Sequence, residues 1–465
     1  MNGKWFDERG TIMGTNKEES AKQYVERIIH TVKERSPNEP EFYQAVEEIA
    51  YSLVPVFEKH PHYIKHAVLE RMTEPDRMIT FRVAWMDDEG VIHVNRGYRV
   101  QFNNAIGPYK GGLRFDPSVN ASIIKFLGFE QIFKNSLTGQ AIGAGKGGAD
   151  FNPKGKSDME IMRFTQSYMN ELSKYIGPNV DVPAGDIGVG GREIDYMVGQ
   201  YKRLRGAFEK GAFTGKGIDV GGSWMRQEST GYGTVYFAKR MLEDQDKSLE
   251  GQRVIVSGAG KVSIYAMEKA IELGAKVIAC SDSSGYIFDE AGLDVEKIKQ
   301  LKEVENKRIS EYTKFNSNTT FDNEESIWTI PCDVALPCAT QNELDENNAR
   351  ALIENDVSVI AEGANMPCTH DAILAFQESD VAFGPGKAAN AGGVAVSALE
   401  MAQNSSRVSW SFEAIDQMLQ DIMTDIYDKS KNAAQEYGQE GNLIAGANIA
   451  GFKKVADVMI AQGII

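Results

Sequence analysis

The sequence predicts an α/β protein with two domains, the first built on a mixed sheet and the second on a parallel sheet. Its 465 residues exceed the roughly 250–300 residues at which a single hydrophobic core stops growing. Segments of alternating polarity in the first half indicate antiparallel strands, whereas short apolar segments alternate with helical ones in the second half. We expect one domain at residues 1–220 and another at 221–440, with a final helix within 441–465 that packs back on the first domain.

The first domain is expected to open with helices and to continue with a hairpin. Residues 18–72 carry apolar side chains at helical spacing. Residues 78–85 and 91–102 then alternate between apolar and polar side chains, which is typical of strands with one buried face. The turn at residues 87–90 ends in glycine and joins these strands into an antiparallel hairpin.

The composition changes between residues 107 and 191. Glycines and lysines recur there in short clusters between two predicted helices, at residues 123–134 and 158–175. Glycine-rich connections between rigid elements are where active-site loops usually lie. The candidate active-site residues are therefore expected in this part of the chain.

Strands and helices alternate in the second domain. Such alternation indicates a parallel sheet covered on both faces. The predicted elements are helices at 231–242 and 264–273 and strands at 254–257, 277–280, 333–337, 357–361 and 381–383. The last predicted helix, at 447–462, is the one expected to pack back on the first domain.

The charge of the chain excludes two classes of partner. A formal net charge of −16 repels phosphate backbones and anionic lipid, so neither a nucleic acid nor a membrane is expected. Residues 1–20 are charged and lack the apolar core of a signal peptide, and no run of about 18 apolar residues occurs. A cytoplasmic location is expected.

Cysteine and histidine positions favour structural roles over metal binding. No CxxC pair occurs, so the cysteines are expected to be buried, reduced thiols. A histidine cluster near residue 60 has metal-like spacing but no carboxylate or cysteine in the pattern, which favours a solvated helix end. We predict no metal. The residues concerned are Cys280, Cys332, Cys338, Cys368, His60, His62 and His66.

A glycine-rich turn carries the cofactor signal. Gly258, Gly260 and Ser263 fit G-x-G-x-x-S between a predicted strand and a predicted helix, and Lys261 and Val262 lie within the motif. The first glycine permits the tight turn, the second lets the backbone approach a pyrophosphate, and the small third residue allows close packing. A Rossmann-like dinucleotide-binding domain is therefore predicted, although a tight turn without a ligand is the alternative.

The type of dinucleotide stays open at this point. The next strand ends at Ser281 and Asp282, where an acid can bond the ribose hydroxyl of NAD or can simply cap a turn. Lys261, Lys307 and Arg308 can meet the 2′-phosphate of NADP or can be ordinary surface cations.

Three lysines and one aspartate carry the substrate signal. Lys110 and Lys146 are flanked by glycine, and Lys134 lies on a predicted helix between them. Two such cations can clamp two carboxylates, while a third, forced toward its neutral form by burial and like charge, suits acid–base work. For each lysine taken alone, a position in a solvated loop or a contact with a phosphate is as good an interpretation as a contact with substrate. Asp186, in a rigid glycine-rich loop, can shuttle protons or cap the following helix.

Long motifs in the same order resemble the glutamate dehydrogenases, and the hexameric bacterial and fungal branch of the Glu/Leu/Phe/Val dehydrogenase family in particular. They include Gly-Pro-Tyr-Lys-Gly-Gly-Leu-Arg-Phe at 107–115, Val-Pro-Ala-Gly-Asp at 182–186, Ala-Glu-Gly-Ala-Asn-Met-Pro at 361–367 and Lys-Ala-Ala-Asn-Ala-Gly-Gly-Val at 387–394. The resemblance implies reversible oxidation of L-glutamate to 2-oxoglutarate and ammonium with hydride transfer to NADP or NAD. It also implies a homohexamer.

The resemblance also implies roles for individual residues. Lys146 would activate water and Asp186 would move protons. Lys110 and Ser397 would hold the side-chain carboxylate and Lys134 the α-carboxylate. The implied pocket lining is Gly111, Gln131, Ala184, Gly185, Thr214 and Val394, and the implied cofactor contacts beside the glycine-rich turn are Thr230, Asn365 and Asn390.

Departures from the family pattern concern the cofactor. Lys261 stands where the family usually has asparagine, and Glu305 stands where NADP-using relatives often carry lysine. The segment 281–285, Ser-Asp-Ser-Ser-Gly, matches NADP-using bacterial members, so NADP is favoured and NAD is the alternative. A dehydrogenase for apolar amino acids is the nearest rival, but Lys110 would then face an apolar side chain at a cost of several kcal/mol.

Overall fold

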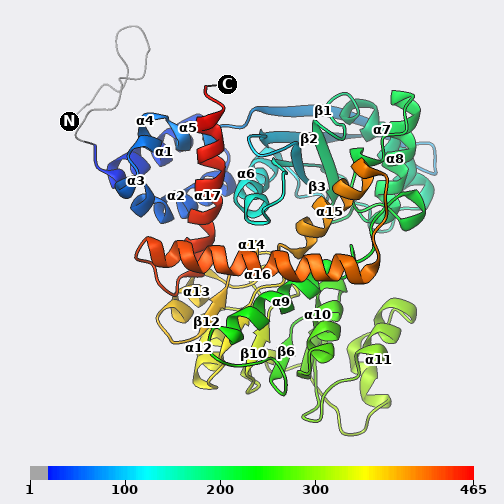
Figure 1. Ribbon diagram of the computed structural model, residues 1–465. Coiled ribbons are helices and arrows are strands. Elements are labelled where there is room, and N and C mark those ends of the chain that lie inside the picture. Colours follow the sequence, from blue (N-terminus) through cyan, green and yellow to red (C-terminus); the bar gives the residue numbers. More distant parts are fainter. Residues whose placement is uncertain (1–18, 465) are drawn as a thin grey trace.

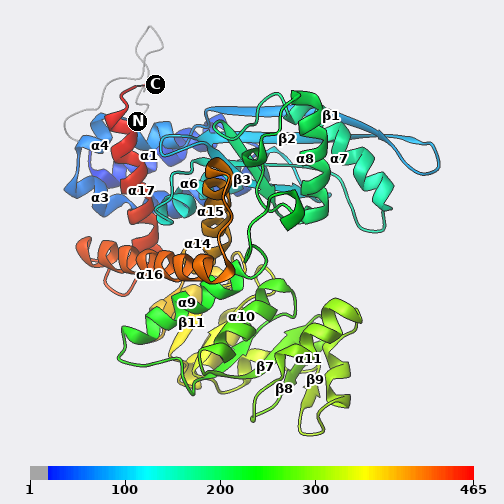
Figure 2. The ribbon, with the colours of Figure 1, turned by 45° about the vertical axis from the view of Figure 1, so that its right-hand side comes forward.

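The computed structural model describes residues 19–464, which form two sheets with their covering helices (Figure 1). A long helix, α16 (Phe412–Glu436), runs between the two parts, and α17 (Leu443–Ala461) rises from its end toward the helices that begin the chain (Figures 1 and 2). The prediction that the chain opens without a signal-peptide core falls almost wholly on residues outside this range. No helix of the described residues is long and apolar enough to cross a membrane.

The first sheet has five strands in the order β1-β2-β4-β3-β5. Strands β1 and β2 form the predicted hairpin, β2 and β4 are antiparallel, and β3 is parallel to both β4 and β5. The mixed sheet expected from the sequence is confirmed. Its strands are β1 (Arg77–Met86), β2 (Ile92–Asn103), β3 (Tyr109–Phe115), β4 (Ala144–Ala149) and β5 (Asp181–Gly185).

Strands β3, β4 and β5 were not predicted, because their glycines and lysines hide the usual alternation of apolar side chains. Glycine is needed there for close packing of the backbones. A Cβ atom on Gly111 would lie 1.6 Å from the carbonyl oxygen of Gly145, and one on Gly148 would lie 2.2 Å from that of Arg114. Bare backbone thus lets these strands and their lysines come close together.

Helices cover this sheet, and most were expected. Asn120 and Ser157 cap the two helices predicted near the lysines, α6 and α7. Apolar side chains of the opening helices share one core with α6 and with the last helix, α17, which packs against α6. The helices are α1 (Ala21–Arg35), α2 (Pro40–Ser52), α3 (Val54–Lys59), α4 (His62–Lys65), α5 (Val68–Met72), α6 (Ala121–Leu137), α7 (Asp158–Leu172) and α8 (Gly191–Arg205).

The second sheet has seven strands in the order β12-β11-β10-β6-β7-β8-β9. Five are parallel, as predicted, but β8 and β9 extend the sheet in antiparallel fashion, so the expectation of a wholly parallel sheet is wrong at this edge. A two-residue turn lets β8 fold directly back on β7, whereas a parallel neighbour needs a long crossover. The strands are β6 (Arg253–Val256), β7 (Lys276–Asp282), β8 (Gly285–Phe288), β9 (Thr320–Asp322), β10 (Val334–Leu336), β11 (Val359–Ala361) and β12 (Ala382–Gly384).

Helices on both faces of this sheet bury two apolar cores. The larger core contains side chains of α9, α10, α15 and α16, and the smaller contains side chains of α12 and α13. Cys280, Cys332, Cys338 and Cys368 are buried and free, as predicted. The helices are α9 (Ser229–Glu243), α10 (Lys261–Glu272), α11 (Val295–Lys299), α12 (Glu346–Glu354), α13 (His370–Gln377), α14 (Gly386–Ala389) and α15 (Gly392–Ser406).

Candidate active site

Adjacent strands of the first sheet bring three predicted site residues together. Lys110 lies on β3, Lys146 on β4, and Asp186 directly follows β5. A Cβ atom on Gly112 of β3 would lie 2.9 Å from the Cβ of Asp186 and 3.3 Å from the Nζ of Lys146. Both side chains therefore extend over Gly112, where a side chain would block them.

Lys146 and Asp186 form an ion pair. The Lys146 Nζ lies 3.1 Å from Asp186 Oδ2, and the Arg114 Nε donates to the same oxygen at 2.8 Å. Burial opposes the charge on Asp186, but Lys146 and Arg114 outweigh it and hold the pKa of the carboxyl at about 2. Burial lowers the pKa of Lys146, and Asp186 partly offsets that effect. An ammonium with a lowered pKa beside a fixed carboxylate is suited to proton transfer.

Lys134 connects the first sheet to the second. It lies in the last turn of α6, and its ammonium donates to the Oδ1 of Asn390, which follows α14. The Asn390 amide nitrogen donates in turn to Asn365 Oδ1 at 2.9 Å. Burial lowers the pKa of Lys134 to about 8, with Lys146 adding to the effect and Glu130 opposing it. A predicted substrate residue and two predicted cofactor residues thus form one chain of hydrogen bonds.

Lys110 is buried among other cations. Burial lowers its pKa well below the usual range, and the charges of Arg226 and Arg99 add to this effect. Arg99 forms a buried pair with Asp181 and donates to the Gly111 carbonyl at 3.1 Å. A carboxylate arriving near Lys110 would restore its positive charge, because an opposite charge favours the ammonium form.

Two basic residues near the site were missed by the sequence analysis. Arg114 follows the predicted Lys110 motif by four residues, and it binds Asp186. Arg226 precedes α9; its Nε is buried without a hydrogen-bond partner among the described residues, and its charge acts on Lys110. Such an orphaned donor is suited to an anion. Arg114 belongs to the quoted motif and so carried a signal. Arg226 begins the segment Arg-Gln-Glu-Ser at 226–229, where the resemblance implies Arg-Pro-Glu-Ala, but no role was predicted for it.

Most of the predicted pocket residues belong to four elements. Gly111 belongs to β3, Gln131 to α6, Ala184 and Gly185 to β5, and Val394 and Ser397 to α15. Thr214 lies in the loop after residue 212, its backbone nitrogen donates to the Pro183 carbonyl on β5 at 3.0 Å, and its hydroxyl is buried without a partner among the described residues.

The glycine-rich turn has the predicted form. Gly258 has φ +84°, a conformation that favours glycine, and a Cβ there would lie 2.6 Å from Ser263 Oγ. Gly260 caps α10 without a side-chain hydrogen bond, and a Cβ there would meet nothing within 4 Å. Open space beside uncapped N–H groups at the start of a helix fits a pyrophosphate. Val262 and Lys261 occupy the first turn, with Lys261 Nζ donating to Gln227 at 2.7 Å.

The end of β7 is occupied by an ionic network. Asp282 accepts from Lys302 Nζ at 2.8 Å, from the Ser284 N–H at 2.8 Å and from the Ile309 N–H at 3.1 Å. Burial opposes its charge, but Lys302 and Ser284 lower its pKa to about 2. In this arrangement Asp282 stabilises the loop, which is the turn-capping alternative from the sequence. Ser281 Oγ accepts from the Gly258 N–H at 2.8 Å.

The candidate 2′-phosphate cations lie in different surroundings. Arg308 donates to the hydroxyl of Ser283, directly beside Asp282. Lys307 instead pairs with Glu305 at 2.7 Å. Among the three cations predicted to meet a 2′-phosphate, Lys261, Lys307 and Arg308, it is Arg308 that lies beside the end of β7, where the ribose is expected.

Thr230 completes the contact between α9 and α15. A Cβ on Gly393 would lie 2.6 Å from Thr230 Oγ1 and 3.7 Å from the Nη1 of Arg226. Thr230 therefore lies beside the first turn of α15, close to Val394. One predicted cofactor residue, Thr230, and one predicted substrate residue, Val394, thus lie where α9 and α15 pack.

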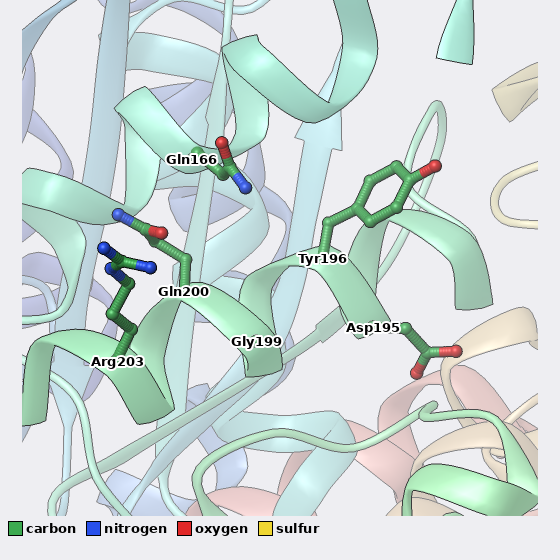
Figure 3. Close-up of a pocket in the computed structure, with 6 residues that line it drawn as sticks. All are labelled: Gln166, Asp195, Tyr196, Gly199, Gln200 and Arg203. Carbon is green, nitrogen blue, oxygen red and sulfur yellow. The ribbon is translucent and has the colours of Figure 1, made fainter. Parts of the chain in front are cut away.

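A separate surface hollow lies between α7 and α8 (Figure 3). Its volume is about 440 Å³, and it is open to solvent. Gln166, Asp195, Tyr196, Gly199, Gln200 and Arg203 line it, and none of the predicted site residues is among them. We therefore do not assign the chemistry to this hollow.

A glycine-rich turn that fits a pyrophosphate and a cluster of buried cations on a second sheet together define a class, the two-domain dinucleotide-dependent dehydrogenases. The Glutamate/Leucine/Phenylalanine/Valine dehydrogenase model matches residues 221–463, and the Glu/Leu/Phe/Val dehydrogenase, dimerisation domain model matches residues 75–203. The chain belongs to the Glu/Leu/Phe/Val dehydrogenase family.

Similar proteins cover nearly the whole chain. The NADP-specific glutamate dehydrogenase of Helicobacter pylori is 53% identical over 95% of this chain and 100% of its own length. That of Escherichia coli is 53% identical over 95% of this chain and 99% of its own. The crystal structure of Plasmodium falciparum glutamate dehydrogenase covers 99% of this chain and 100% of its own at 48% identity, with a TM-score of 0.94.

Proposed function

We propose that this chain is an NADP-dependent glutamate dehydrogenase that interconverts L-glutamate and 2-oxoglutarate with ammonium. The observation that carries the proposal is the group of three buried lysines, Lys110, Lys134 and Lys146, around one carboxylate, Asp186. Two of the relatives at 53% identity carry the same activity in their names. The assignment of individual residues below is part of the proposal.

Two of the lysines bind the substrate in this proposal. Lys110 and Ser397, which belongs to α15, hold the side-chain carboxylate, and Lys134 holds the α-carboxylate. The buried hydroxyl of Thr214 and the buried Nε of Arg226 have no partner among the described residues and offer further hydrogen bonds. Gly111, Gln131, Ala184, Gly185 and Val394 line the pocket without adding charge.

Lys146 and Asp186 perform the proton transfers. Because burial lowers its pKa, Lys146 gives up a proton more readily than an ordinary lysine and can polarise the water that attacks the imine carbon. Asp186 is ionised in the resting site and so can accept a proton from the substrate nitrogen, while Arg114 keeps it oriented. The Lys146–Asp186 distance of 3.1 Å lets a proton pass directly between them.

The residues of the second sheet fit a dinucleotide. Gly258, Gly260 and Ser263 shape the turn, and the N-terminus of α10 with Lys261 and Val262 faces the pyrophosphate. NADP, when bound, accepts or supplies the hydride of the reaction. Thr230, Asn365 and Asn390 are placed to orient its nicotinamide end, because Asn390 also contacts the substrate lysine Lys134.

The ribose end favours NADP over NAD. Lys302 engages Asp282, which leaves that carboxylate less able to accept from a ribose hydroxyl and less repulsive to a phosphate. The guanidinium of Arg308 beside Ser283 supplies the matching cation. Asp282 and Ser281 then act by holding the loop in place.

Two further features are part of the proposal. Six copies assemble into a homohexamer, as the resemblance to the hexameric branch implies. The domain limits are 1–220, with the helix of 441–465 packed back on it, and 221–440 for the dinucleotide, which agrees with the contact of α17 with α6. A cytoplasmic location is likewise proposed.

An absorbance assay at the reduced-nicotinamide band tests the proposal. The purified chain is given 2-oxoglutarate, ammonium and either NADPH or NADH. We expect rapid oxidation of NADPH that needs both other substrates, and slower oxidation of NADH. Turnover with an apolar 2-keto acid in place of 2-oxoglutarate would overturn the assigned substrate.

A further inference from the structure

Glu362 is a buried carboxylate that the proposed mechanism does not use. It directly follows β11 and is 4% exposed. Its Oε2 accepts from the Gly386 N–H at 2.7 Å, and its Oε1 accepts from the Cys368 N–H at 3.3 Å. Because burying a carboxylate is costly, the two N–H groups that it binds indicate what it does in this fold.

Gly386 is the first residue of α14, a helix of a single turn. Pro385 precedes it and provides no capping hydrogen bond, so Glu362 supplies the acceptor for the first N–H group of the helix. A Cβ atom on Gly386 would lie 3.2 Å from Glu362 Oε2 and 3.5 Å from Asn390 Nδ2. The carboxylate of Glu362 and the side-chain amide of Asn390 therefore lie on the same side of Gly386.

Asn390 connects α14 to residues of both sheets. Its N–H donates to the Gly386 carbonyl at 2.9 Å, so one backbone hydrogen bond joins the start of this helix to its end. Its side-chain amide donates to the Ala364 carbonyl at 3.0 Å and to Asn365 Oδ1 at 2.9 Å, and its Oδ1 accepts from the Lys134 ammonium. A shift of Gly386 is therefore passed to Asn390, and from there to Lys134 and Asn365.

Glu362 also holds the loop that carries Asn365. The start of this loop is held by the Pro337 carbonyl, which accepts from the two N–H groups that follow Glu362 at 2.9 Å each. The end of the loop is held by Glu362 itself, through the Cys368 N–H. One carboxylate thus joins the two segments that meet in the hydrogen bond between Asn365 and Asn390.

We propose that Glu362 is a positioning residue, which joins the loop of residues 363–368 to α14 and thereby fixes the position of Asn390. Asn390 in turn places the Lys134 ammonium and the Asn365 side chain. The inference rests on the proposed function, which assigns Lys134 to the α-carboxylate of the substrate and Asn365 to the nicotinamide end of the dinucleotide. Glu362 touches neither ligand in this proposal.

This role has a consequence that a merely structural role lacks. If Glu362 acts through Asn390, a substitution of Glu362 weakens substrate binding only while the Asn390 side chain is present. If Glu362 only stabilises the fold, the two substitutions act independently and their effects on binding multiply. A double-mutant cycle on the two residues distinguishes these cases.

The cycle compares the wild type, Glu362→Gln, Asn390→Ala and the double variant. Glutamine is nearly the same size as glutamate but has one acceptor oxygen in place of two, so it cannot accept from both N–H groups. The Kd of 2-oxoglutarate for the complex with NADPH is measured from the nicotinamide fluorescence. Ammonium is left out, so that no turnover occurs, and all four proteins are measured at one pH.

We expect Glu362→Gln to raise this Kd by about fivefold or more, as for the loss of a buried hydrogen bond. In the Asn390→Ala background the same substitution should change the Kd by less than about twofold. An equal increase in both backgrounds, or no increase in the wild-type background, overturns the inference alone. A wild type that does not bind 2-oxoglutarate overturns the proposed function and this inference together.

Gly386→Ala disturbs the same contact and serves if Glu362→Gln does not fold. Its Cβ would lie 3.2 Å from Glu362 Oε2 and 3.0 Å from the Ala364 carbonyl oxygen, so the start of α14 must shift. The Kd of 2-oxoglutarate should rise in this variant too, and the rise should be lost in the Asn390→Ala background. A rise of the same size without the Asn390 side chain contradicts the inference.

Asp289→Asn is the matched control. Asp289 is 3% exposed and, like Glu362, binds a backbone N–H, that of Ala291 at 2.9 Å, but it follows β8 at the antiparallel edge of the sheet. Its substitution removes a buried acceptor that has no link to Asn390, so the Kd should stay within about twofold of the wild type. A rise as large as that of Glu362→Gln would assign the effect to general loss of packing and overturn the inference.

Discussion

At the scale of single residues, the chemistry depends on how burial and neighbouring charges set the protonation of each lysine. Lys110, Lys134 and Lys146 all have lowered pKa values, with burial as the largest cause. Their remaining neighbours differ, because Asp186 contacts Lys146 while Arg226 and Arg99 act on Lys110. In the proposed mechanism the same residue type therefore supplies two anion-binding groups and one proton carrier.

Lys146→Ala tests the proton carrier. The variant should lose at least about a hundredfold in kcat, the lower range for loss of an acid–base group, while NADPH binding followed by fluorescence stays the same. Lys174→Ala is the control, because Lys174 is exposed and pairs with the surface residue Glu171. Full turnover by Lys146→Ala would reject the role given to Lys146.

Lys110→Leu tests the cation for the side-chain carboxylate. Glutamate should lose about 2–4 kcal/mol of transition-state stabilisation, because its carboxylate would be buried without a partner. The ratio of kcat/KM for glutamate to that for norvaline, which lacks the carboxylate, should therefore fall about thirtyfold or more. A variant that keeps the wild-type preference for glutamate contradicts this assignment.

The pH dependence follows from Lys134. Its pKa of about 8 means that the free enzyme loses this positive charge as the pH rises through that value. The kcat/KM for 2-oxoglutarate should begin to decline no later than about pH 8, since this parameter reports groups of the free enzyme. Activity recovered after return to neutral pH provides the control for unfolding. A profile that stays flat to about pH 9.5 contradicts a role for this ammonium in binding.

At the scale of elements, backbone geometry places the reactive groups. Strands β3 and β4 approach so closely that Gly111 has no room for a Cβ, and this approach brings Lys110 and Lys146 onto neighbouring strands. The turn between β6 and α10 requires a positive φ at Gly258 and leaves space at Gly260. Glycine therefore serves close packing in the first sheet and ligand access in the second.

Gly258→Val tests the turn. A β-branched residue at φ +84° is strained, and its Cβ would lie 2.6 Å from Ser263 Oγ, so the turn must shift. The KM for NADPH should rise at least about tenfold, since the pyrophosphate contacts depend on that turn, and stability should fall by about 1–3 kcal/mol. Gly251→Val is the control; Gly251 also has positive φ, but a Cβ there meets nothing within 4 Å. An unchanged KM for NADPH in Gly258→Val would contradict the assigned turn.

At the scale of the whole molecule, α17 connects the two parts. Its first turns contribute Leu443 and Ala447 to the larger core of the second sheet, and its later turns contribute Phe452 and Val455 to the core shared with α1–α6. The Tyr63 hydroxyl donates to Asp457 at 2.7 Å and adds a polar link. The end of the chain thus stabilises the arrangement of both sheets.

Phe452→Ala tests this link. Phe452 is 0% exposed and packs edge-on against Phe57 and Tyr63, so its truncation should lower the free energy of unfolding by about 3–5 kcal/mol. The KM for NADPH should stay within about twofold, because the substitution is distant from the turn at Gly258. Thermal unfolding and initial rates measure the two effects. A melting temperature equal to that of the wild type would contradict the role of α17 in stabilising the arrangement of the two sheets.

Local sequence patterns were enough to predict the two-domain α/β class, the hairpin, the helices with strong apolar spacing, the glycine-rich turn and the site lysines, because each depends on neighbouring residues. Local patterns could not predict the antiparallel edge of β8 and β9, the glycine-rich strands β3, β4 and β5, or the contacts of Arg114, Arg226 and Asn390, because these depend on tertiary packing. Arg114 and Asp186 are 72 positions apart, and Lys134 and Asn390 are 256 apart. Contacts between residues so far apart in sequence depend on how strands and helices pack. The local spacing of residues does not reveal that packing.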